Sequence, residues 1–61
     1  MNKSELKQIA MISKYHALGM TDTVARVLSA LIRAARTNKS RQALIEQAGV
    51  FGVVSHPEFI I

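Results

Sequence analysis

The clearest pattern of apolar and polar positions lies between residues 21 and 36. Its apolar side chains recur at steps of three and four residues, which places them on one face of a helix about four turns long. These side chains are Val24, Val27, Leu28, Leu31, Ile32 and Ala35. Arg26, Ser29 and Arg33 fall on the other side, and Arg36 follows. The pattern predicts an amphipathic helix over 22–36 whose apolar face packs against another element.

An earlier stretch, residues 3–18, carries a second helical pattern. Asn2 can cap its start, and Glu5 stands three residues later, which completes a capping-box pattern. The main apolar face is predicted to comprise Leu6, Ile9, Ala10, Ser13 and Ala17. A further apolar side comprises Met11, Tyr15 and Leu18. Two apolar sides indicate two neighbours, of which one is the second helix and the other is a partner subunit or more of the same core.

The link between these two helices is short. Gly19 is suited to end the first helix in a left-handed conformation, with Met20 folding back on Tyr15. Thr21 is predicted to cap the next helix, with Asp22 in its first turn. Such a short connection predicts an antiparallel helical hairpin.

The polar residues after Arg36 interrupt the helical pattern. Ser40 can cap a short third helix over 41–48, which Gly49 would end. A continuous helix through the polar stretch is the alternative. The predicted fold is therefore all-α: a hairpin, a short third helix and a tail, in a single domain covering residues 1–61.

Residues 50–61 form a tail of different composition. Gly52 permits a bend, and Pro57 excludes a helix interior or a central strand, so we expect this tail to be extended. Its large apolar side chains are too many for a free terminus, so it must pack on the helices or on a second chain. The residues predicted to form an interface are Met11, Tyr15, Leu18, Phe51, Val53, Val54, Phe59 and Ile60.

Chain length and composition bear on the assembly state. A chain of 61 residues buries only about 60% of the surface that its unfolded form exposes. Small domains usually gain stability from disulfides, a metal or self-association, and this chain has no cysteine. Because 49% of its residues are hydrophobic, we expect a homodimer or another protein partner.

The charge is strongly positive. Eight Lys and Arg against four Asp and Glu give a formal net charge of +4, which favours nucleic acid or an acidic protein as partner. Solubility alone is the alternative explanation, and cations at the end of the second helix also stabilise its dipole. The residues predicted to contact nucleic acid are Lys7, Lys14, Arg26, Arg33, Arg36, Lys39 and Arg41.

Residues for catalysis or metal binding are sparse. His16 and His56 are the only histidines, and the four carboxylates are scattered, so no metal-ligand spacing arises. No nucleophile elbow or Gly-rich phosphate loop surrounds any serine. We therefore expect no enzyme, no cofactor and no small-molecule substrate. Neither a secretory signal nor a membrane-spanning run is evident, so a cytoplasmic location without membrane contact is expected.

Two segments resemble DNA-binding motifs in part. Residues 43–55, ALIEQAGVFGVVS, are similar to a helix-turn-helix phrase, but Gly52 and Pro57 would fall inside the recognition helix. Residues 36–48 resemble the turn and second helix of ribbon-helix-helix repressors, which need a strand where residues 13–20 have a helical pattern. No family is assigned on these grounds. The expected function is a small basic regulator that binds the nucleic-acid backbone as a dimer; the alternative is an inhibitor or adaptor that docks on a protein through apolar helix faces and the tail.

Overall fold

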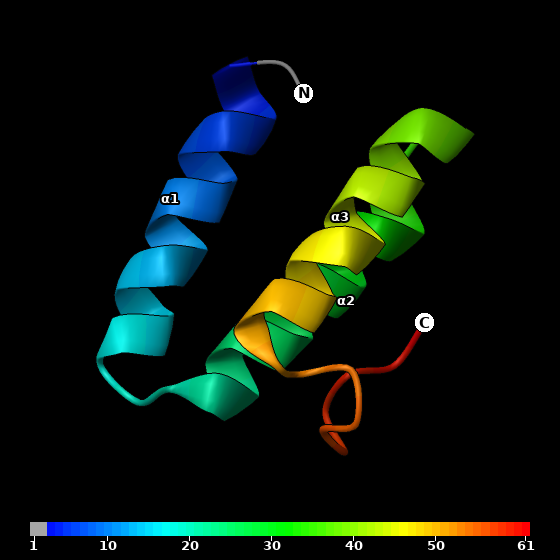
Figure 1. Cartoon of the computed structure of the whole chain (residues 1–61). Coiled ribbons are helices and arrows are strands. Elements are labelled where there is room, and N and C mark those ends of the chain that lie inside the picture. The colour runs from blue at the N-terminus through cyan, green and yellow to red at the C-terminus, as the bar shows by residue number, and fades with distance from the viewer. Residues whose placement is uncertain (1–2) are drawn as a thin grey trace.

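A computed structural model describes residues 3–61, which form three helices and a tail (Figure 1). Helix α1 covers Lys3–Ala17, α2 covers Thr21–Ala34 and α3 covers Asn38–Phe51. No strand occurs between residues 3 and 61, which confirms the all-α prediction for this range. Asn2, the predicted cap of the first helix, lies outside the described residues.

Helix α2 is the centre of the core and contacts both other helices. Its predicted apolar face is confirmed, because Val24, Leu28 and Ile32 are buried and the remaining members of that face pack against the core. Ala25 is fully buried and Ser29 is nearly so. The assignment of Ser29 to the solvent side was therefore wrong, because Ser29 contacts the C-terminal residues Glu58 and Ile60.

Helix α1 turns a different side to the core than the sequence pattern indicated. Ile12 is fully buried, and Ile9 and Tyr15 pack against the core. Of the predicted main face only Ile9 is in this group; the exposed members are Leu6, Ala10, Ser13 and Ala17. Burying a larger side chain removes more apolar surface from water. The side with two isoleucines therefore faces inward, and the alanine-rich side remains in solvent.

Backbone hydrogen bonds fix the link between α1 and α2. Gly19 adopts the predicted left-handed conformation, with φ at 81°. Its N–H donates to the carbonyl of His16, and the N–H of Met20 donates to the carbonyl of Tyr15, each at a distance of 3.0 Å. The two hydrogen bonds form a Schellman motif. Thr21 does not cap α2 as predicted. It is the first helical residue, and Met20 occupies the cap position without a side-chain cap bond.

The third helix is longer at its start than predicted. Thr37, rather than Ser40, caps it: the Thr37 hydroxyl oxygen accepts the N–H of Ser40 over 3.1 Å. Helix α3 therefore begins at Asn38, only four residues after α2 ends at Ala34. The break between the two helices is thus confirmed, but the predicted start at residue 41 was wrong.

The end of α3 also differs from the prediction. Gly49 lies inside the helix, which continues to Phe51 and stops at Gly52, where φ is 73°. The N–H of Val53 donates to the carbonyl of Ala48 over 3.0 Å, in a second Schellman-type pattern. An internal glycine costs about 1 kcal/mol relative to alanine. Stopping one turn later offsets that cost because it brings Phe51 against the core and buries Val53.

The prediction of an extended tail over residues 50–61 was wrong: Val50 and Phe51 belong to α3, and residues 52–61, called the tail from here on, form turns. Two consecutive turns follow the helix, closed by hydrogen bonds from the His56 N–H to the Val53 carbonyl and from the Phe59 N–H to the His56 carbonyl. Pro57 is the second residue of the second turn, a position that suits its fixed φ. The tail then runs beside α2 (Figure 1). The turns let it bury Val53 and pack Phe59 against the core of the same chain.

Candidate nucleic-acid interface

The seven basic residues predicted to contact nucleic acid are all exposed, but they do not form one patch. Lys7 and Lys14 lie on α1, and Arg26 lies in the first half of α2. The other four fall within residues 33–41, where α2 ends and α3 begins; this stretch is called the junction. They are Arg33, Arg36, Lys39 and Arg41.

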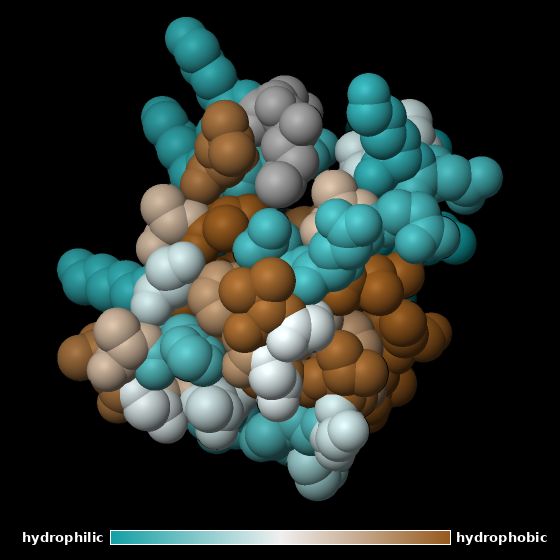
Figure 2. Space-filling model, in the orientation of Figure 1, coloured by the Kyte–Doolittle hydropathy of each residue, from teal (hydrophilic) through white to brown (hydrophobic). Residues whose placement is uncertain are grey.

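The junction concentrates positive charge at one end of the molecule. Figure 2 shows hydrophilic side chains gathered there, at the upper right of the view. Within the described range, residues 3–61, none of the four junction cations forms an ion pair. They are therefore available to an external anion.

The start of α3 is electrostatically unusual within this chain. Helices α1 and α2 each carry an acidic residue in the first turn, Glu5 and Asp22, where it stabilises the positive end of the helix dipole. The first turn of α3 contains no acidic residue. Lys39 is its second residue and Arg41 its fourth, so cations are added to an end that is already positive. Cations at this position lower the stability of the free protein, and they would strengthen the binding of an anion.

A cleft of about 590 Å³ opens beside the junction, between it and the first turns of α1. Its polar lining includes Glu5, Arg36, Thr37 and Ser40. A hydrogen bond of 3.2 Å from the Ser40 hydroxyl to Oε1 of Glu5 joins the start of α3 to the start of α1. This contact joins the two walls of the cleft, and of the four junction cations Arg36 lines it.

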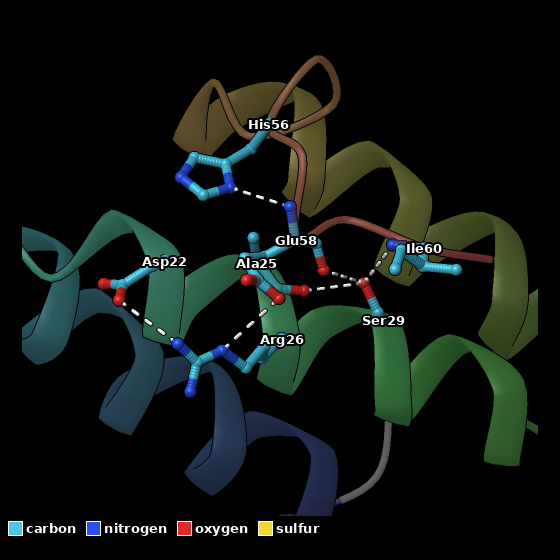
Figure 3. Close-up of polar contacts among 7 residues, drawn as sticks. All are labelled: Asp22, Ala25, Arg26, Ser29, His56, Glu58 and Ile60. Atoms are coloured by element: carbon cyan, nitrogen blue, oxygen red, sulfur yellow. Dashed lines mark hydrogen bonds and ion pairs between the residues drawn. The ribbon is translucent and has the colours of Figure 1, made fainter.

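Arg26 is the one basic residue of the described chain that forms ion pairs (Figure 3). Its Nη2 lies 3.3 Å from Oδ2 of Asp22, one turn earlier on α2, and its Nε lies 3.5 Å from Oε2 of Glu58 in the tail. The Asp22 partner could have been predicted from the four-residue spacing. The Glu58 partner could not, because it lies 32 positions away.

The tail explains why Ser29 is buried. Its hydroxyl oxygen accepts a hydrogen bond from the Ile60 N–H at a distance of 2.8 Å (Figure 3). The same oxygen lies 2.7 Å from the carbonyl oxygen of Ala25 and 3.3 Å from that of Glu58. The buried hydroxyl is thus fully hydrogen-bonded, as burial of a polar group requires. In the same segment Nδ1 of His56 accepts the N–H of Glu58 over 3.0 Å.

This polar cluster does not have the arrangement of a catalytic triad. Ser29 bonds backbone groups, and His56 also bonds a backbone N–H, so no base contacts the hydroxyl. The second histidine, His16, places Nε2 3.1 Å from the carbonyl of Phe51 and so ties α1 to the end of α3. Residues 3–61 contain no group of three side chains that could hold a metal ion and no helix long and apolar enough to cross a membrane.

The residues predicted to form an interface divide into two sets. Val53 belongs to the core of the chain, and the aromatic residues pack against that core; these are Tyr15, Phe51 and Phe59. The other four are substantially exposed: Met11, Leu18, Val54 and Ile60. Only the second set remains accessible to another molecule.

Comparisons with known proteins give no further guide: no family model matches the chain, and neither the curated proteins nor the solved structures gave a match. A functional proposal must therefore stand on the residues and contacts described above.

Proposed function

We propose that this protein is a small, non-enzymatic regulator that binds the phosphate backbone of nucleic acid through the junction. The observation that carries the proposal is the set of four exposed, unpaired cations of residues 33–41 next to a helix start that lacks an acidic residue. Phosphate contacts by Lys and Arg supply most of the affinity of sequence-independent binding. A helix N-terminus adds N–H donors for the same oxygen atoms.

In this proposal the active form is a homodimer in which α1 and α2 make an antiparallel hairpin. Dimerisation would double the number of junctions that one nucleic-acid molecule can meet. The exposed apolar side chains support self-association, because contact with a second chain would remove them from water. The largest exposed fractions belong to Val50, Leu18, Ile61 and Ile60, at 75%, 66%, 62% and 61%.

The same exposed residues support a second candidate, an inhibitor or adaptor that docks on a larger protein. Met11 on α1, Leu18 in the link after it and Val54 in the tail would then contact that partner. Its binding would depend on apolar area and would persist at high salt, whereas phosphate binding would not. Salt dependence therefore separates the two functions.

The test compares two double variants that remove the same charge. R33Q/R36Q changes the junction, and K7Q/K14Q changes α1. Binding to a labelled mixed-sequence DNA duplex is measured by fluorescence anisotropy at several salt concentrations. If each junction arginine contacts one phosphate, R33Q/R36Q lowers the slope of log affinity against log salt by about 1.8, at about 0.9 for each contact. K7Q/K14Q is expected to change the slope far less.

Two outcomes would contradict the proposal. Absence of salt-dependent binding by the unaltered protein would exclude a phosphate-binding function. Equal losses in the two double variants would mean that net charge, and not the junction, governs binding. Light scattering of the same samples measures the assembly state, and twice the chain mass of 6.7 kDa is expected.

A further inference from the structure

The tail lies against the side of α2 that carries two arginines. Arg26 and Arg33 are seven residues apart, so they share one side of α2 and are separated by about 10 Å along its axis. Ser29, which holds the Ile60 N–H, lies between them in sequence, and Glu58 pairs with Arg26 (Figure 3). The tail thus pairs with Arg26 through Glu58, whereas Arg33 forms no ion pair with any residue of 3–61.

We propose that the tail acts as an autoinhibitory strap, in which the Glu58 carboxylate occupies Arg26 in place of a nucleic-acid phosphate. A carboxylate and a phosphate both offer the oxygen acceptors that a guanidinium group binds. When the tail is seated, Arg26 is neutralised by two carboxylates. When a polyanion displaces Glu58, Arg26 joins Arg33 and extends the binding surface from the junction along α2.

The geometry suits an exchange of partners. The Arg26 side chain is 60% exposed and that of Glu58 is 46% exposed, so water and anions reach the pair. Exposed ion pairs contribute little to stability, and a second anion of higher charge can therefore replace Glu58. Asp22 would stay beside Arg26, since both belong to α2, and would hold the guanidinium in position.

The anchors of the tail define which part moves. Val53 is buried in the core, directly after Gly52, and keeps the base of the tail on the subunit. Beyond Pro57 the anchors on the rest of the molecule are the Phe59 side chain, the Ser29 hydrogen bonds and the Glu58 ion pair, and within the tail the N–H groups of residues 58 and 59 bond His56. Release of residues 58–61 therefore leaves the three helices and the base of the tail in place.

This inference rests on the proposed function, and its test uses a matched pair of charge variants in the full chain. E58Q removes the carboxylate that pairs with Arg26. E46Q removes one from the exposed surface of α3, where Glu46 forms no ion pair with any residue of 3–61. Both variants raise the net charge by one. We expect E58Q to bind the DNA duplex several-fold more tightly than E46Q, with a salt slope steeper by about 0.9, the value of one added phosphate contact.

A third variant and a second measurement test the same mechanism. R26Q/E58Q should lose the gain of E58Q, because the arginine that the tail releases is absent. In the unaltered protein, addition of the duplex should accelerate hydrogen exchange at the Ile60 amide, which loses its Ser29 acceptor. Exchange at buried amides of α2 should not accelerate.

The outcomes separate the two proposals. If the unaltered protein shows salt-dependent binding that R33Q/R36Q weakens, yet E58Q and E46Q bind alike and Ile60 exchange is unchanged, the strap is refuted and the junction stands. If no variant binds the duplex, both proposals are refuted. A gain in E58Q that persists in R26Q/E58Q would also refute the strap, because the gain would not come from Arg26.

Discussion

Helix α2 passes through two different surroundings. Over residues 22–29 it lies under the tail, where Ser29 is hydrogen-bonded and Arg26 is held by two carboxylates. At the junction the cations are exposed and no carboxylate of the described chain pairs with them. Two of the four acidic residues are thus used on a single arginine. Basic residues of one chain therefore differ in availability, and net charge alone does not identify those that can bind an anion.

Contacts under the tail join it to α2, and under the proposed function the junction residues bind the nucleic acid. Substitutions in each region should therefore differ in kind. Under the tail they should lower stability. At the junction, substitutions of the cations should alter binding, and an acidic residue in place of Lys39 should raise stability, whereas loss of the Thr37 cap should lower it.

The largest effect on stability is expected from Ser29→Ala. The substitution removes the acceptor of the Ile60 N–H inside a partly buried contact, which should lower the free energy of unfolding by about 1–2 kcal/mol. The matched control is Ser13→Ala, an exposed serine within α1 that should change stability by less than about 0.5 kcal/mol. Urea denaturation followed by circular dichroism measures both. Equal effects would mean that the tail contact does not stabilise the fold.

A smaller loss is expected from Thr37→Ala at the junction. The side chain of Thr37 caps α3, and loss of such a cap costs about 1 kcal/mol. Thr21→Ala is the control, because Thr21 also stands at a helix start but makes no cap bond to α2. Thermal unfolding should show a lower Tm for T37A and almost none of that change for T21A. The reverse order would contradict the assignment of the two helix starts.

The smallest effect on stability has the opposite sign. Lys39→Glu places an acidic residue in the first turn of α3 and should stabilise the protein by about 0.3–1 kcal/mol through the helix dipole. Under the proposed function the same variant binds DNA more weakly. Lys14→Glu changes the net charge equally but lies in the last turn of α1, so it should lower stability.

For the K39E and K14E variants, urea denaturation measures stability and fluorescence anisotropy measures DNA binding, so the two effects can be compared in the same protein. A K39E protein that is both more stable and weaker in DNA binding would indicate that Lys39 is kept for binding. If K39E is no more stable than the unaltered protein, the argument from the α3 dipole fails.

The sequence pattern predicted the apolar face of α2 correctly because only one of its sides is strongly apolar, although the helix ends at Ala34 and not at residue 36. It failed for α1, where Leu6 and the alanines repeat at the same helical spacing as Ile9 and Ile12. Periodicity alone does not determine which of two apolar sides is buried. The side with the isoleucines is buried against α2 because these larger side chains remove more apolar surface from water. The end of α3 was missed for a similar reason, since Gly49 and Gly52 are both plausible stops and burial of Val53 selects the later one.

The candidate site was predictable only in part. Seven cations were visible in the sequence, and the grouping of four of them at the junction follows from their closeness along the chain. The neutralisation of Arg26 by Glu58 and the burial of Ser29 were not visible. Both depend on contacts between residues about 30 positions apart, which depend on how the tail turns at Pro57.

The separation of these contacts along the chain has a consequence for the order of folding. Helices α1 and α2 are joined by three residues whose backbone bonds form locally, and such local structure forms quickly. The Ser29 to Ile60 contact closes a loop of about 30 residues that includes all of α3, and closure of a loop has an entropic cost. We therefore expect the tail to dock late in folding and to detach early in unfolding, so loss of the Ser29 contact should accelerate unfolding and leave the folding rate nearly unchanged.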